Sequence, residues 1–169
     1  MDSSKQVIHD LIHTPGNPRN SEGAFLPCAD GSIRFLYTRY SGKDWHDHAE
    51  ADIAQIVSRD KGISWSEPEV VIRHGGAANI MSVSLLRLTS GEILMFYLMK
   101  RHAPSGELNC IPVLRRSSDD GHSWSGEQFL FETNYYVLNN DRVIQCRSGR
   151  LILPLCQHTW RINGTPRPG

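Results

Sequence analysis

Four carboxylic acids of this chain, Glu22, Asp47, Asp52 and Asp141, are candidates for acid–base chemistry. A carboxyl group that is partly removed from water keeps its proton to a higher pH and can hand it to a leaving oxygen atom. Such chemistry also needs side chains that hold the substrate beside the acid. The candidates for that role are Arg39, Asn79, Ser82, Arg101, Asn140, Arg142 and His158. The elements that position both sets follow from an internal repeat.

One eight-residue motif, S-x-D-x-G-x-S-W, occurs twice, at residues 58–65 and 117–124. A second pattern occurs three times and consists of an apolar stretch, a two-residue turn that ends in glycine, and another apolar stretch. The turn glycines Gly31, Gly91 and Gly149 are 60 and 58 residues apart, and the two motifs are 59 residues apart. Two independent markers therefore share one period, which predicts a repeat architecture.

Each repeat resolves into four short strands. Glycine reaches positive φ without a steric penalty, and the residues that flank each turn are rich in Val, Ile, Leu, Phe and Tyr, as in a β-hairpin. A third strand leads into each motif, at residues 51–57 and 110–116, and a fourth follows it, at 67–72 and 127–132. Four antiparallel strands per repeat of this length are typical of a propeller blade. The sequence thus predicts an all-β fold built as a partial β-propeller.

The S-x-D-x-G-x-S-W motif is predicted to be structural. Aspartate and serine side chains bond to nearby backbone amides in tight turns, glycine permits the reversal, and tryptophan packs its ring between sheets. The two motif aspartates are therefore assigned to turns rather than to catalysis. The motif residues are Ser58, Asp60, Gly62 and Trp65 in the first copy, and Ser117, Asp119, Gly121 and Trp124 in the second.

This arrangement resembles the Asp-box, or BNR-repeat, propellers of the sialidase (neuraminidase) superfamily over roughly residues 17–160, and stretches such as "NPRNSEGAF" and "NNDRVI" are similar to bacterial sialidase-like glycoside hydrolases. The resemblance implies about two and a half four-stranded antiparallel blades of a six-bladed propeller domain. The blades are expected near residues 20–72, 78–132 and 138–169, with residues 5–13 as a ring-closing outer strand. Because a propeller needs about four to eight blades to close, we expect the chain to be the N-terminal part of a longer protein.

Strand order predicts which face of this fold carries the chemistry. The hairpin turns and the motifs fall on one face, while the loops between second and third strands and the links between blades fall on the other. The inner strands begin on that second face, which places Glu22, Ser82, Asn140 and Asp141 there, beside the ends of the second strands at Arg39. The alternatives at each position are a solvated loop edge and an internal salt bridge.

The loop at residues 41–52 is predicted to hang over the same face. The resemblance implies that the acid/base aspartate lies on this loop, where Asp47 is nearer the tip and Asp52 immediately precedes the third strand. Two alternatives stay open: His46 and His48 bind a metal ion together with a neighbouring aspartate, or the loop is simply solvated. No further metal-ligand spacing accompanies the two histidines, so neither a metal nor a cofactor is predicted.

The chain departs from the family at the first inner strand. The family's first substrate-binding arginine belongs to an F-R-I-P motif, and the aligned residues 21–24 read S-E-G-A here, with Arg19 two residues early. An arginine binds a carboxylate through two parallel hydrogen bonds, whereas Glu22 would repel it. This departure favours a neutral sugar or another glycan over sialic acid. Tyr135 and Tyr136 are expected to pack or to stack on a sugar, because the family's nucleophilic tyrosine lies in later blades.

The resulting hypothesis is a sialidase-like exo-glycosidase that acts on a terminal sugar of a glycan, with its pocket on the face opposite the motifs. The isolated chain is expected to be inactive because its ring is open. The alternative is a non-catalytic carbohydrate-binding or structural propeller module.

Composition excludes several other classes. The 18 basic and 18 acidic residues cancel, which gives no electrostatic basis for binding nucleic acid or an anionic membrane. No apolar run approaches the roughly 18 residues that span a bilayer. The start of the chain does not read as a signal peptide, so a cytoplasmic location is expected if the N-terminus is complete. The four cysteines lack C-x-x-C spacing and are expected to be free thiols.

Overall fold

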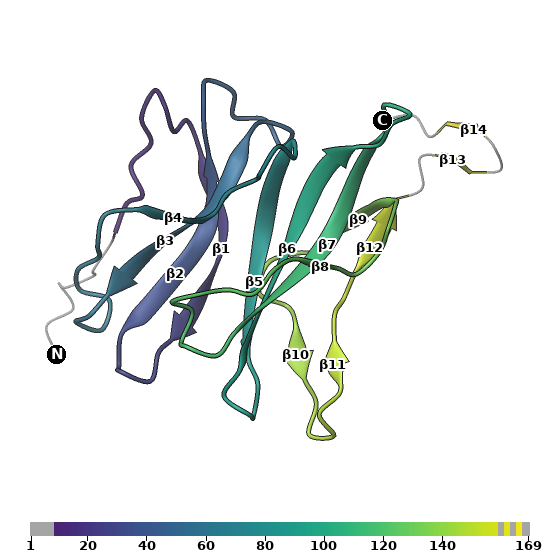
Figure 1. Ribbon diagram of the computed structural model, residues 1–169. Helices are drawn as coiled ribbons and strands as arrows, with labels where there is room; N and C mark the ends of the chain where they lie inside the picture. The colour runs from purple at the N-terminus through teal and green to yellow at the C-terminus, as the bar shows by residue number, and fades with distance from the viewer. Residues whose placement is uncertain (1–8, 159–160, 163–164, 167–169) are drawn as a thin grey trace, which may run out of the picture.

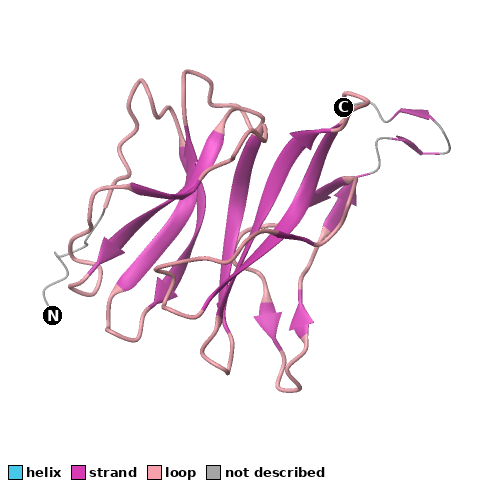
Figure 2. Ribbon diagram, in the orientation of Figure 1, coloured by secondary structure: helices cyan, strands magenta, loops and turns pink. Residues whose placement is uncertain are grey.

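The computed structural model describes residues 9–158, 161–162 and 165–166. Within these ranges the chain forms strands and no helix, and none of its sheets closes on itself (Figures 1 and 2). The part of the chain that is described therefore contains no helix long and apolar enough to cross a membrane. The predicted all-β class is confirmed.

The first repeat forms a four-stranded antiparallel sheet in chain order. Its strands are β1 (Asn20–Pro27), β2 (Ile33–Tyr40), β3 (Ala51–Ser58) and β4 (Glu69–Ile72). The hairpin turn between β1 and β2 contains Gly31 at φ 83°, the conformation for which glycine was expected there. These strands lie where the sequence placed the four strands of the first repeat.

The second repeat forms a larger sheet than expected. The strands β5 (Asn79–Arg87), β6 (Ile93–His102) and β7 (Leu108–Ser117) pair antiparallel, and the short β8 (Gln128–Phe129) pairs with the middle of β7. Because β8 is so short, the first half of β7 is free to pair with β9 (Tyr135–Val137), a segment that the sequence suggested was only a link.

The third repeat is divided between two sheets. The strand β12 (Cys156–His158) extends the second sheet beside β9, whereas β10 (Ile144–Gln145) and β11 (Leu151–Ile152) form a separate hairpin. A further small ladder joins β13 (Arg161–Ile162) to β14 (Thr165–Pro166).

The N-terminal end of the expected architecture is described only in part. The ring-closing strand was expected at residues 5–13, and of these residues 5–8 lie outside the described ranges. Residues 9–13 belong to no strand, and Leu11 packs against the outer face of the first sheet. The ring-closing role and the blade boundaries stay predictions.

The main core lies between the first and second sheets. Leu36 and Ile53 of the first sheet pack against Met95 and Tyr97 of the second. Alternate residues of β6 point the other way, and Phe96 packs on the third repeat instead. Because β6 is buried on both faces, its sequence is a continuous apolar run rather than an alternating one.

Each S-x-D-x-G-x-S-W motif folds into a turn with the same hydrogen bonds. In the first copy, Ser58 Oγ accepts the Gly62 N–H at 2.7 Å, and Asp60 accepts both the N–H and the hydroxyl of Ser64 at 2.8 and 2.5 Å. The bonds from Ser64 are the main reason that the pKa of Asp60 is lowered to about 2. The second copy repeats this geometry around Asp119, whose pKa is also lowered. Both aspartates are occupied in holding their turns.

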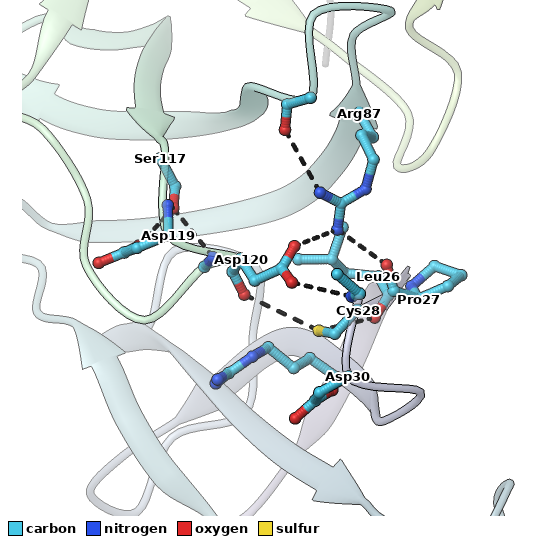
Figure 3. Close-up of polar contacts among 12 residues, drawn as sticks. Leu26, Pro27, Cys28, Asp30, Arg87, Ser117, Asp119 and Asp120 are labelled. Atoms are coloured by element: carbon cyan, nitrogen blue, oxygen red, sulfur yellow. Dashed lines mark hydrogen bonds and ion pairs between the residues drawn. The ribbon is translucent and has the colours of Figure 1, made fainter.

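The second motif also ties the two sheets together, as Figure 3 shows. Asp120 Oδ1 lies 2.6 Å from Arg87 Nη2, and the same nitrogen donates to the carbonyl of Pro27 at 2.9 Å. The other carboxylate oxygen of Asp120 accepts the Ala29 N–H at 2.8 Å. One aspartate therefore fixes the hairpin of the first sheet against the inner strand of the second.

The two ends of the sheets carry different connections. The β1–β2, β5–β6 and β10–β11 turns lie together at the lower edge in Figure 1, and the β2–β3 and β6–β7 loops lie at the upper edge. We call this upper edge the loop rim. It is the face on which the sequence placed the candidate site.

Candidate functional site

An irregularity near the start of each inner strand shapes the loop rim. Glu22 has φ 45°, Ser82 has φ 60° and Asp141 has φ 56°, and the first two lie at register shifts in β1 and β5. Residues other than glycine rarely adopt positive φ, and such strain concentrates at functional sites. All three are residues that the sequence placed at this site.

Hydrogen bonds tie these strand starts to one another across the repeats. Ser82 Oγ donates to Glu22 Oε2 at 2.9 Å, and the backbone N–H of Ser82 donates to Thr38 Oγ1 at 3.1 Å. Asn140 Nδ2 of the third repeat donates to the Gly23 carbonyl at 3.2 Å. The polar groups at the three strand starts therefore form one connected cluster.

Two further predicted residues, Asp141 and Arg142, lie at the edge of this cluster. The backbone N–H of Asp141 donates to Ser84 Oγ at 2.6 Å, while the residue itself is exposed. Arg142 is exposed as well. Both lie where solvent or a ligand can reach them.

The β2–β3 loop brings Asp47 to the rim, where Arg19 binds it. Arg19 Nη1 lies 2.6 Å from Asp47 Oδ1 and donates to the Trp45 carbonyl at 3.1 Å. The hydrogen bond from Arg19 is the main reason that the pKa of Asp47 is lowered, and the nearby charge of Lys100 adds to it. The Asp47 side chain is 63% exposed, so its carboxylate is accessible to a ligand.

The second sheet holds the same loop from the other side. Asn79 Nδ2 donates to the carbonyls of Asp47 and Ala49 at 2.8 and 2.9 Å. Lys100 Nζ donates to the Asp47 carbonyl at 2.5 Å. Lys100 is only 3% exposed, and burial lowers the pKa of its ammonium group. Asn79, expected to bind substrate, thus uses its amide group to hold the loop.

Three buried polar atoms lie at the rim. Ser21 Oγ and Tyr40 OH are close to each other, and a side-chain hydrogen bond from Ser21 partly opposes the effect of burial, which raises the pKa of Tyr40. The Arg19 guanidinium lies 4.6 Å from the centre of the Tyr40 ring. Asn79 Oδ1 has no hydrogen-bond partner among the described residues, and buried polar atoms are costly without one.

The structure does not bring Asp52 and Arg39 to this cluster. Asp52 Oδ1 accepts hydrogen bonds from the backbone N–H of His74 at 2.7 Å and from its ring Nδ1 at 2.8 Å. Arg39 lies opposite Asp52 in the β2–β3 ladder and lines a cavity of about 520 Å³ beside Trp65, on the outer face of the first sheet. Successive residues of a strand point to opposite faces of the sheet. Arg39 points to the outer face, so Tyr40 points to the other face.

The remaining predicted residues, Arg101 and His158, contact aromatic rings. The Arg101 guanidinium lies 4.6 Å from the centre of the Phe129 ring and lines a second cavity, of about 300 Å³, with His74. The ring of His158 meets that of Tyr135 edge-on at 5.9 Å. Neither residue has a direct contact with Glu22 or Asp47 among the described interactions.

Sequence reasoning left three members of the cluster out of the candidate site: Arg19, Tyr40 and Lys100. A signal for two of them was present, since Tyr40 and Lys100 both lie nine residues after a turn glycine. The selected Arg39 lies eight residues after its glycine and points to the other face. Nothing in the local pattern around Arg19 showed that its long side chain reaches the rim.

Among the described residues, no three His, Cys, Asp or Glu side chains gather as a metal site. His46 instead stacks on Trp45 with ring centres 4.5 Å apart, and its Nδ1 lies 2.6 Å from Asp44 Oδ1.

Comparison with known proteins defines the class of fold. No protein-family model and no curated protein matches the chain. Several solved structures match it, among them the Hadza microbial sialidase Hz136 at TM-score 0.68 and 16% identity, a Dyadobacter fermentans protein of unknown function at 0.66 and 18%, and the intramolecular trans-sialidase of Ruminococcus gnavus, solved with oseltamivir carboxylate, at 0.63 and 11%. The chain therefore has a sialidase-like fold.

The extent of these matches also bears on the architecture. They cover 84%, 82% and 85% of this chain but only 33%, 46% and 56% of the three solved structures. The chain thus spans between a third and a little over half of the length of these similar proteins.

Proposed function

We propose that this chain forms part of a sialidase-like glycoside hydrolase that removes a terminal sugar from a glycan, with the substrate at the loop rim. One observation carries the proposal: at this rim Glu22 of the first repeat accepts a hydrogen bond from Ser82 of the second, and Asp47 of the first repeat is held by Arg19 and by Lys100 of the second. Carboxylates, cations and hydroxyl groups that converge on one edge can bind sugar hydroxyls and transfer protons.

Asp47 is the best candidate for proton transfer. Arg19 holds the pKa of Asp47 below its usual range, so the free protein presents a carboxylate that can accept a proton. A donor role requires the substrate to draw Arg19 away, because the loss of that ion pair raises the proton affinity of the carboxyl group. Glu22 supplies the second carboxylate, and the exposed ring of Trp45 offers a flat surface on which a sugar can stack.

The finer architecture belongs to the same proposal. We take the two motif turns to be Asp boxes of a six-bladed propeller, because their hydrogen bonds repeat from one copy to the next. The isolated chain is then expected to show no turnover, since the strands that complete the ring and the remaining site are missing from it.

A hydrolysis assay on a panel of glycans with different terminal sugars, neutral and anionic, tests the proposal in the complete propeller. We expect Glu22→Gln and Asp47→Asn to reduce kcat/KM by about 100-fold or more, as for lost acid–base groups. Asp52→Asn and Asp141→Asn complete the panel. Glu92→Gln, in the β5–β6 turn at the other end of the sheets, where Glu92 pairs with Arg116, is the matched control and should keep full activity.

A second candidate is a carbohydrate-binding module without catalysis. It is favoured by the ion pair between Arg19 and Asp47, because a carboxylate that is paired with an arginine can serve a purely structural role. Binding of a glycan without cleavage would select this candidate. Full activity of all four carboxylate variants would refute the assigned catalytic roles.

A further inference from the structure

The β2–β3 loop that carries Asp47 is held both by bonds within itself and by side chains outside it. Within the loop, the Ser41 N–H donates to the Glu50 carbonyl and the Ala49 N–H to the His46 carbonyl, both at 2.9 Å, and the His46 N–H donates to Asp44 Oδ1 at 3.0 Å. The bonds that fix its position on the rim come from Arg19, Asn79 and Lys100. The latter two belong to the second sheet, so the placement of Asp47 depends on a neighbouring repeat.

Lys100 is the unusual member of this set. Lys100 is only 3% exposed, yet its side chain ends in a charged group that is costly to bury without partners. Its ammonium nitrogen donates to the Asp47 carbonyl at 2.5 Å and lies 6.0 Å from the centre of the Tyr135 ring. A neutral residue of similar length would avoid the burial cost, so the charge itself requires an explanation.

We propose that Lys100 is a positioning residue, which reaches across from the second sheet to hold the Asp47 loop on the rim and to set the proton affinity of the Asp47 carboxylate. Its donated hydrogen bond fixes the backbone of Asp47, and its positive charge favours the ionised form of the side chain at the same residue. Its importance for catalysis rests on the proposed function, whereas the positioning itself does not.

The electrostatic surroundings of Asp47 and Lys100 include several other groups, which the test must keep constant. They are Arg19 before β1, Glu22 on β1, Tyr40 at the end of β2, His48 on the loop itself, Cys110 on β7 and Tyr135 on β9. Arg19 makes the direct ion pair with Asp47, so it lowers the pKa of Asp47 more than the charge of Lys100 does.

The test uses two variants that separate the hydrogen bond from the charge. Lys100→Met removes both the hydrogen bond and the charge. Methionine is close to lysine in shape, and its unbranched apolar side chain suits a buried position. Lys100→Gln keeps a donor for the Asp47 carbonyl and removes only the charge. Lys43→Met, an exposed lysine on the same loop, removes the same charge away from the contact and is the matched control.

Two measurements on the full chain report the outcome. In Lys100→Met, amide hydrogen exchange at Ala49 should become about 10- to 100-fold faster, as expected for loss of a hydrogen bond from a charged group. Carboxyl NMR should show the pKa of Asp47 raised in both Lys100 variants, with near-normal exchange in Lys100→Gln. Lys43→Met should change neither quantity.

An unchanged Asp47 pKa in both Lys100 variants, or unchanged Ala49 exchange in a folded Lys100→Met, would overturn the inference. If Lys100→Met does not fold, the pKa measured in Lys100→Gln decides the electrostatic part alone. Neither measurement needs a glycan. Positive results together with an absence of hydrolysis would therefore reject the proposed function and leave the role of Lys100 standing.

Discussion

Replacement of Gly23 by alanine tests whether the close approach of β1 to β2 beside the bulge requires glycine. A Cβ atom at this position would lie 2.7 Å from the carbonyl oxygen of Leu36 and would overlap the ring of Phe35. The ring can rotate, but the carbonyl belongs to the β1–β2 ladder, so β1 has to move away from β2. We expect Gly23→Ala to destabilise the fold by about 1–3 kcal/mol, as overpacking does in a well-packed region.

Thermal unfolding followed by circular dichroism measures this effect. For a chain of this size the expected loss corresponds to a fall in Tm of about 2–12 °C. Gly16→Ala is the control, because a Cβ atom there meets nothing within 4 Å, and it should change stability by less than about 0.5 kcal/mol. Equal Tm values for the two variants would refute the reasoning that the bulge requires glycine at position 23.

Two further perturbations concern the turns at the opposite end of the sheets. The pKa of Asp60 is lowered to about 2 in the folded chain, so its contribution to stability is present above the unfolded value of about 4 and is lost as the pH falls from there toward 2. Asp60→Asn should therefore flatten the acid limb of a plot of unfolding free energy against pH, and an unaltered limb would contradict this. Arg87→Ala and Asp120→Ala should each cost about 1.5–3 kcal/mol in urea unfolding, and the double variant should cost less than their sum because they share one contact. Strict additivity would show that the pair does not act as a unit.

Much of the fold followed from periodicity in the sequence. The turn glycines and the S-x-D-x-G-x-S-W motifs marked where strands begin and end, because positive φ and side-chain-to-backbone bonds are local requirements. The strands β1 to β7 accordingly lie close to their predicted positions. The later strands agree less well, because β9 pairs with the free part of β7 and β12 pairs with β9, and such pairing is not encoded by any local signal.

The candidate site was predicted in part. Glu22 and Ser82 were found from their distance to the turns, and Asp47 from its place on the loop after the second strand. The structure joins Glu22 to Ser82 and holds Asp47 through Lys100 at the same rim. Arg39 was chosen in place of Tyr40 because it lies eight residues after the turn glycine, and both faces of β2 mix apolar and polar residues, so its sequence shows no clean alternation to reveal which face each residue belongs to.

The sequence by itself determined the repeat, the turns and the level along each strand at which polar side chains gather, because all three depend on short-range geometry. Only the tertiary structure decided that Arg19 and Lys100 meet at the backbone and side chain of Asp47. These three residues are brought together by the packing of one sheet on another. That packing depends on the shapes of whole faces, which no spacing along the chain records.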